Sequence, residues 1–234
     1  MILGIETAVD HVGVALGDHR GIRAQTSLAS DRRHAEALTP MIKFVMQQAG
    51  VSMEELSTVA VDVGPGLFTG MRVGIAAAQS MAWALEIPLA AICSLDALAM
   101  HGDTADIPVA AALDARRGEV YWAMYRMRGG GAEPQRITEP VVSPPEDLAV
   151  YLAERGEEVL CVGSGFDRHQ ELFEASPWVS PLSTHGCVPT AEAVVTLASH
   201  CVAADKTVSA TDIQPMYLRA PDAEINWQTR EGSK

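Results

Sequence analysis

The sequence lacks the segments that would place it in a membrane or in an oxidising compartment. No apolar run among its 234 residues reaches the roughly 20 residues of a membrane-spanning helix. The first residues, MILGIETAVD, have neither a basic region nor a cleavage signature, so we expect no signal peptide. The cysteines, Cys93, Cys161, Cys187 and Cys201, are scattered without a C-x-x-C pair, which favours reduced thiols. We therefore expect a cytoplasmic protein with no membrane partner.

Basic residues are also scarce. Lys and Arg number 17 against 30 Asp and Glu, which gives a net charge of −13. Nucleic-acid binding draws much of its affinity from Lys and Arg that neutralise phosphates. The composition therefore disfavours a stand-alone nucleic-acid-binding protein. If the chain acts on nucleic acid, we expect a partner to supply the basic surface.

The common catalytic motifs are missing as well. The sequence has no H-E-x-x-H, and its seven histidines show no spacing suited to a metal site on one helix face. No G-x-S-x-G nucleophile motif occurs, since GSG at 163–165 is one residue short. We predict no catalytic residues and no metal ligands. His34, which precedes the first long helix and follows two arginines, is interpreted as a helix-entry residue on a solvated surface.

The residues that are present form two similar halves. In the first half, three strands, a helix, a strand and a helix are predicted at 2–6, 12–16, 22–27, 35–49, 57–63 and 68–85, and a strand at 87–93 leads onward. The second half repeats this order from 107 onward, and Gly163 and Gly165 take the place of Gly64 and Gly66. We predict a duplicated βββαβα fold, with an N-terminal lobe at 1–103, a C-terminal lobe at 104–218 and a flexible tail at 219–234.

The stretch DVGPGLFTGMRVG at 62–74 allows two interpretations. A glycine loop between a strand and a helix could present backbone N–H groups to a phosphate. However, the Walker lysine is missing, Pro65 removes a donor, and small residues follow, which favours a tight turn before a closely packed helix. Nucleotide or anion binding stays the alternative. Its candidate residues are Glu6, Thr7, Gly64, Gly66, Thr69, Gly163 and Gly165.

Two further features involve charged residues. Glu6, Asp62 and Asp114 are predicted near strand ends, where carboxylates of a magnesium–nucleotide site could lie. In LDARRGEVYWAMY, charged residues fill the turn between two apolar strands. This turn is either a charged hairpin tip or a lip of the cleft between the lobes.

Five ordered strings closely resemble the bacterial TsaB (YeaZ) family. They are ILGIETAVDHVGVAL, RRHAEALTPMI, VDVGPGLFTGMRVGIAAAQSMA, LDARRGEVYWAMY and QPMYLR, and they extend from residue 2 to residue 219. The order of the elements resembles the actin/hexokinase/Hsp70-like ATPase superfamily. The resemblance implies an α/β fold of two lobes, of which the second is reduced.

The family's function is implied in the same way. Its members are subunits of the cytoplasmic machinery that makes threonylcarbamoyladenosine in tRNAs reading ANN codons. A paralogue, TsaD, transfers the threonylcarbamoyl group to the adenosine 3′ of the anticodon, and the ATPase TsaE is the third member. The resemblance implies that this chain is a non-catalytic scaffold that contacts tRNA only through the complex. It requires no cofactor of its own, with ATP and Mg acting at the level of the complex. TsaD holds its metal through a His-x-x-x-His pair, whereas this chain has His34 and Leu38.

The family docks through two helices that resemble 35–49 and 68–85 here, onto TsaD or onto a second copy. The interface residues predicted on this basis are Leu38, Met41, Ile42, Val45, Met46, Ala49, Gly70, Gly74, Ala77, Ala78 and Met81. Ala77→Arg or Val45→Glu is expected to abolish complex formation and to leave the fold intact.

Alternative functions remain open. Many family members read Ile-Asp-Thr at the end of the first strand, where this chain reads Ile5-Glu6-Thr7, which argues against retained ATP hydrolysis. The alternative from another class is a stand-alone small-molecule kinase or ATPase of the same fold. A metallopeptidase would need a ligand set that the sequence does not show.

Overall fold

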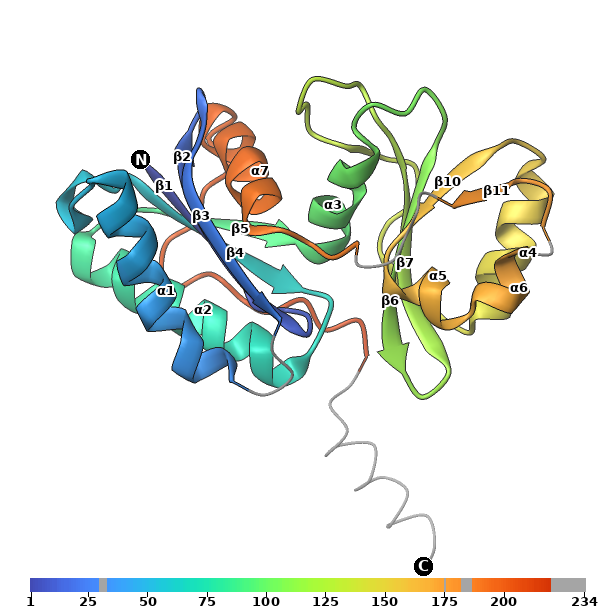
Figure 1. Ribbon diagram of the computed structural model, residues 1–234, viewed down its shortest axis with the longest axis horizontal. Helices are drawn as coiled ribbons and strands as arrows, with labels where there is room; N and C mark the ends of the chain where they lie inside the picture. Colours follow the sequence, from blue (N-terminus) through green and yellow to red (C-terminus); the bar gives the residue numbers. More distant parts are fainter. Residues whose placement is uncertain (30–32, 175, 182–186, 220–234) are drawn as a thin grey trace, which may run out of the picture.

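The computed structural model describes residues 1–29, 33–174, 176–181 and 187–219 and consists of two α/β lobes side by side (Figure 1). The N lobe is built on a five-stranded sheet of order β3-β2-β1-β4-β5. Its strands are β1 (Ile2–Glu6), β2 (His11–Asp18), β3 (Gly21–Ala29), β4 (Thr58–Gly64) and β5 (Leu89–Cys93). Strand β1 runs antiparallel to β2 and parallel to β4, so the apolar β1 lies at the centre of the sheet.

The second lobe repeats this arrangement. Its sheet has the order β11-β10-β6-β7-β8, with β9 also paired to β7. The strands are β6 (Val109–Arg116), β7 (Glu119–Arg126), β8 (Gln135–Arg136), β9 (Val141–Ser143), β10 (Val159–Val162) and β11 (Val179–Pro181). Strand β6 runs antiparallel to β7 and parallel to β10, as β1 does to β2 and β4. The predicted duplication is therefore confirmed.

One face of each sheet carries the helices that its own half supplies (Figure 1). The helices α1 (His34–Ala49) and α2 (Phe68–Leu85) cover the first sheet, and the short turn η1 (Met53–Glu55) follows α1. On the second sheet the corresponding helices are α4 (Pro145–Arg155), α5 (Ser164–Arg168) and α6 (Gln170–Glu174). Because α5 and α6 have five residues each where α2 has 18, the second lobe is the reduced one. The predicted two-lobed α/β fold with a reduced second lobe is confirmed.

The other face of each sheet is covered by a helix from the opposite half. Val194 and Val195 of α7 (Ala191–Ala203) pack on Ile2 and Ala60 of the first sheet. Leu98 of α3 (Ser94–Ala99), which continues into η2 (Met100–Gly102), packs in the core of the second sheet. The predicted boundary after residue 103 thus lies between the strands of the two sheets, but α3 before it and α7 after it each pack on the sheet of the other half. Of the predicted tail, residues 220–234 lie outside the described part of the chain.

Helix α7 can approach the first sheet because glycine faces it. A Cβ on Gly4 would lie 2.6 Å from Cγ2 of Val195 and 2.9 Å from the carbonyl oxygen of Ala191. Gly13 and Gly17 on β2 face the same helix and would also place a Cβ against it. Glycine within strands marks such close approaches. These three positions fix the distance between α7 and the sheet.

Candidate functional site

Two carboxyl groups lie side by side at the centre of the first sheet. Glu6 ends β1 and Asp62 lies on the parallel neighbour β4, and both side chains are buried. Oε1 of Glu6 accepts a hydrogen bond of 2.7 Å from the Ala8 N–H. Oδ1 of Asp62 accepts 2.7 Å from the Gly64 N–H and 2.6 Å from the hydroxyl of Ser94. Each carboxyl group therefore holds the turn that follows its strand.

The second oxygen of each carboxyl group is left without a partner. Oε2 of Glu6 and Oδ2 of Asp62 are buried and accept no hydrogen bond from the described residues. Burial, and next the charge of Asp62, raise the pKa of Glu6 well above its ordinary value, while burial raises the pKa of Asp62. Of the two carboxyl groups, Glu6 therefore keeps its proton to the higher pH. Both carboxyl groups thus lie inside the N lobe and bond to the turns after β1 and β4.

The other residues predicted around a nucleotide are also engaged within the protein. The Thr7 hydroxyl is buried and donates to the Gly70 carbonyl at 2.8 Å. The Leu67 N–H donates to the Ala8 carbonyl at 2.7 Å, and a Cβ on Gly66 would lie 2.1 Å from that same oxygen. The glycine stretch thus fits closely against the turn after β1. This geometry supports the interpretation as a tight turn over that as a phosphate cradle.

The corresponding loop of the second lobe has the same backbone. Gly64 ends β4 and Gly163 directly follows β10, with φ of 105° and 108°, a region that favours glycine. Cβ atoms on Gly163 and Gly165 would meet Ala112. The four glycines are therefore equivalent turn residues on two separate sheets, while Thr69 is exposed in the first turn of α2.

His34 differs from its predicted role. It is buried, not solvated, and its Nε2 lies 2.8 Å from the carbonyl oxygen of Val9 in the turn after β1. Leu38, one turn further along α1, is 2% exposed and belongs to the core. Among the described residues, no group of three or more His, Cys, Asp or Glu side chains could hold a metal ion.

The predicted docking residues on α1 and α2 divide into two sets. Six of the eleven are buried: Leu38, Val45, Met46, Gly70, Gly74 and Ala78. Predicting them as surface was wrong, because the apolar stripe of each helix faces its own sheet. The two glycines also face the N lobe itself. A Cβ on Gly70 would lie 2.1 Å from the carbonyl oxygen of Thr7, and a Cβ on Gly74 would lie 2.3 Å from Oγ1 of Thr7. The remaining five, Met41, Ile42, Ala49, Ala77 and Met81, are half-buried.

A groove between α1 and α2 remains open to solvent. Its volume is about 720 Å³, and its apolar lining includes Ile42, Ala77, Met81 and Met53 of η1. Lys43 lies among the polar lining residues. Sequence reasoning missed Met53, because the apolar pattern of α1 ends before this turn. We refer to this feature as the α1–α2 groove.

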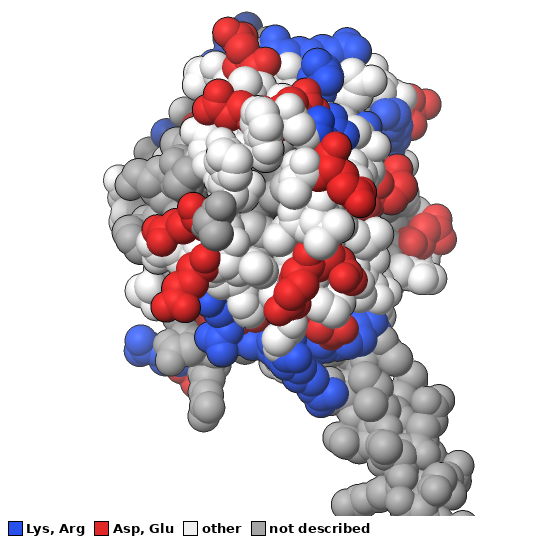
Figure 2. Space-filling model, turned by 90° about the vertical axis from the view of Figure 1, so that its right-hand side faces the viewer, with Lys and Arg blue, Asp and Glu red and all other residues white. Residues whose placement is uncertain are grey.

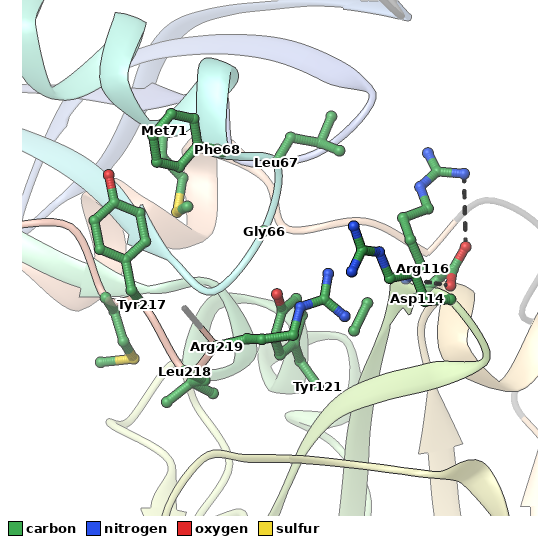
Figure 3. Close-up of a pocket in the computed structure, with 13 residues that line it drawn as sticks. Gly66, Leu67, Phe68, Met71, Asp114, Arg116, Tyr121, Tyr217, Leu218 and Arg219 are labelled. Carbon is green, nitrogen blue, oxygen red and sulfur yellow. Dashed lines mark hydrogen bonds and ion pairs between the residues drawn. The ribbon is translucent and has the colours of Figure 1, made fainter. Parts of the chain in front are cut away.

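A second cavity lies between the lobes and has a volume of about 340 Å³ (Figure 3). It is lined by the loop 66–68 and Met71 of the N lobe, by the β6–β7 turn 114–117 with Tyr121, and by the C-terminal segment 216–219. The charged turn predicted as a hairpin tip or a cleft lip is both. Segment 216–219 was missed because its position depends on a long-range bond, from the Met216 N–H to the Val63 carbonyl at 2.7 Å.

Basic side chains are unevenly distributed over the surface. Figure 2 shows one group of them along the lower edge of one face and another at its top, with acidic side chains across its middle. The β6–β7 turn, with Arg116 and Arg117, lies at that lower end of the molecule in Figure 1.

Comparison with known proteins identifies the family. The sequence model of the family described as "TsaD: tRNA N6-adenosine threonylcarbamoyltransferase" matches residues 27–227. The Escherichia coli "tRNA threonylcarbamoyladenosine biosynthesis protein TsaB" is 33% identical over 238 residues, covering 100% of this chain and 99% of that protein. This chain belongs to the TsaB (YeaZ) family. The Bacillus subtilis TsaB is 30% identical, with 97% of each chain covered.

Solved structures agree with the TsaB assignment and with the fold. YeaZ from Pseudomonas aeruginosa is 31% identical with a TM-score of 0.81, covering 93% of this chain and 99% of that one. The ethanolamine utilization protein EutJ from Carboxydothermus hydrogenoformans is 12% identical with a TM-score of 0.50, over 84% and 88% of the two chains. The latter shows the fold alone. Within the described part of this TsaB-family chain, no helix is long and apolar enough to span a membrane.

Proposed function

We propose that this chain acts in the biosynthesis of threonylcarbamoyladenosine in tRNA as a non-catalytic subunit. It binds a catalytic paralogue of the same fold, TsaD, in a complex that includes the ATPase TsaE. The relatives in E. coli and B. subtilis bear the name of this pathway. Leu38 supports the non-catalytic role, because the paralogue's second metal ligand corresponds to a position that is packed into the core here.

The observation that carries the proposal is the α1–α2 groove. Two adjacent helices leave Ile42, Ala77 and Met81 half-exposed around a hollow of about 720 Å³. Helices pack at 8–10 Å by inserting side-chain ridges into grooves, and methionine adapts to different partner surfaces. A helix of the paralogue seated here completes a bundle with α1 and α2. A second copy of this chain would compete for the same groove.

The test places a charge in the groove without touching the core. Ile42→Glu and Ala77→Arg alter half-exposed side chains, so the isolated chain stays folded. Central contacts of an interface cost about 2 kcal/mol or more when they are lost, which weakens binding about 30-fold. Co-purification with tagged TsaD, followed by size-exclusion chromatography, should show loss of the complex.

The matched control is Val150→Glu on α4, the helix of the second lobe that corresponds to α1. Val150 is 57% exposed, so this variant carries the same charge change on an equivalent helix and should bind normally. Co-elution of Ile42→Glu with TsaD at wild-type yield would refute the proposal. Val45→Glu is unsuitable as a probe, because Val45 is fully buried.

Calorimetric titration with Mg-ATP separates the scaffold from the stand-alone kinase or ATPase. The buried Glu6 and Asp62 are engaged with their own turns, which leaves them poorly placed to hold a magnesium–nucleotide complex. We expect no turnover by the chain alone. Micromolar binding of Mg-ATP with hydrolysis in the absence of TsaD would instead favour an enzyme.

A further inference from the structure

The cavity between the lobes opens into a cluster of arginines. The lining includes Arg116, Arg117 and Arg219 with the aromatic residues Phe68 and Tyr217. Arg72 and Arg168 adjoin it, because Arg72 bonds to Tyr217 and Arg168 pairs with Asp114. We refer to these residues as the mouth. Among the described residues, Asp10, Asp114 and Glu119 form ion pairs with these arginines. The mouth thus gathers five of the 17 Lys and Arg residues of a chain whose net charge is −13. The basic surface expected from a partner thus has a local counterpart on this chain.

The ion pairs hold the arginines at the mouth without using up their donors. Arg116 lies 3.0 Å from Asp10 of the N lobe and 3.6 Å from Asp114, and Arg168 lies 3.4 Å from Asp114. The side chains of Arg116 and Arg168 are still 54% and 60% exposed. A guanidinium has five N–H donors, so each retains groups directed at solvent. Arg219, paired to Glu119 at 2.6 Å, points into the cavity from the C-terminal segment (Figure 3).

A stack of planar groups borders the same mouth. The rings of Phe68 and Tyr217 are stacked with centroids 5.5 Å apart and an interplanar angle of 26°. Arg72 lies over Phe68 at 3.9 Å and donates to the Tyr217 hydroxyl at 2.9 Å. Phe68 and Tyr217 remain 41% and 38% exposed. Helix α2 begins at Phe68 with no acidic residue in its first turn, so the positive end of its dipole adds to the field.

We propose that this mouth binds single-stranded RNA directly. Phosphates lie against Arg116, Arg117 and Arg219, and a base stacks on the Phe68–Tyr217 pair. A basic groove with exposed aromatic side chains is the combination that single-strand binding sites use. Because the arginines come from both lobes and from the C-terminal segment, they suit an extended polyanion better than one mononucleotide. The inference deepens the proposed function, on which it rests for the identity of the RNA as tRNA.

The first test measures how much the arginines at the mouth contribute to RNA binding. A fluorescein-labelled 17-nucleotide anticodon stem-loop is titrated with the full chain, and anisotropy is followed from 50 to 200 mM KCl. Arg116→Ala/Arg117→Ala removes two charges from the β6–β7 turn, and Arg20→Ala/Arg23→Ala removes two from the β2–β3 hairpin. The first variant should weaken binding tenfold or more and lower the slope of log affinity against log salt by about 1.4, at about 0.7 per phosphate contact. The control should change binding less than twofold.

The second test measures stacking. Phe68→Ala should weaken binding about fivefold or more, in line with base-stacking losses on alanine substitution, and Phe68→Trp should restore it. 4-Thiouridine in the loop should cross-link to Phe68 or Tyr217. Thermal melting of each variant confirms that it is folded before binding is measured.

Several results would overturn the inference. They are the absence of saturable binding by the wild-type chain at 50 mM KCl, an equal loss in the two arginine double variants, and displacement of the RNA by equimolar ATP. The last would assign the mouth to a small nucleotide. Ile42→Glu, which blocks docking, should leave RNA binding by the isolated chain unchanged. Failure of docking and failure of RNA binding are therefore observed separately.

Discussion

Replacing Glu6 with glutamine tests the raised pKa of this buried carboxyl group in the first sheet. In Glu6→Gln the amide oxygen can keep the bond from the Ala8 N–H, and the amide nitrogen supplies a donor beside the unpartnered Oδ2 of Asp62. The variant therefore mimics the protonated side chain at every pH. Any difference that develops between the two proteins as pH changes reports the ionisation of Glu6.

The direction follows from the raised pKa of Glu6. Below the ordinary glutamate pKa of 4.5, Glu6 is protonated in both the folded and the unfolded chain. Its contribution to the stability of the fold is then complete. As pH rises above that value, the unfolded chain releases the proton while the folded chain keeps it. The free energy of unfolding of the wild type then falls by about 1.4 kcal/mol per pH unit until the folded pKa is passed. The free energy of unfolding of Glu6→Gln does not show this decrease, so it rises relative to that of the wild type by the same amount.

Urea unfolding at pH 5, 6 and 7 measures the difference. With a urea m-value of about 3 kcal/mol/M for a chain of this size, the midpoint of Glu6→Gln should rise relative to wild type by about 0.5 M per pH unit. Asp62, whose pKa burial also raises, is present in both proteins. Glu154→Gln, in the exposed face of α4, controls for the loss of a surface carboxylate. A difference that stays constant with pH, or a wild type whose midpoint rises relative to the variant as pH rises, would refute the raised pKa of Glu6.

Two further substitutions test packing and the contact between halves. Val45→Glu places a charge in the N-lobe core and should lower the free energy of unfolding by about 4 kcal/mol or more. The neighbouring Phe44→Glu lies on the exposed face of α1 and should lower it by about 1 kcal/mol or less. Both values are measured by chemical denaturation, and equal losses would contradict the assigned helix face. Asp96→Ala removes the acceptor that Arg136 contacts at 2.8 Å and 2.9 Å and Tyr125 at 2.8 Å, and should cost about 2–3 kcal/mol. An unchanged midpoint for Asp96→Ala would show that this network does not stabilise α3.

Local patterns were sufficient to predict the duplicated fold. Strand β1 and helix α2 have their predicted bounds, because apolar alternation and helical spacing are local properties. The equivalence of Gly64 and Gly163 was also visible in the sequence. It reflects one backbone conformation, with φ near 105° at the end of a parallel strand, which only a residue without a side chain adopts readily.

The exchanged helices could not be predicted in this way. Periodicity shows that a segment is helical and which of its faces is apolar, but not which sheet it covers. The sequence AEAVVTLASHCVA of α7 packs on the sheet of the other half because the chain crosses back between the lobes. A signal was present in Gly4, Gly13 and Gly17, which register on one face of two paired strands. Glycines aligned across strands indicate that another backbone lies against them.

The same reasoning explains why six of the eleven predicted docking residues are buried in the N lobe. A stripe of small and apolar residues has the same pattern whether it faces the protein's own core or a partner. What separates the two is the opposing atom: Gly70 and Gly74 oppose Thr7, and Gly66 opposes Ala8. The glycine stretch at 62–74 is thus shaped by the turn after β1. Because that turn occupies the glycine face of α2, only its other faces are open to partners, toward the α1–α2 groove and toward Phe68 at the mouth of the cavity.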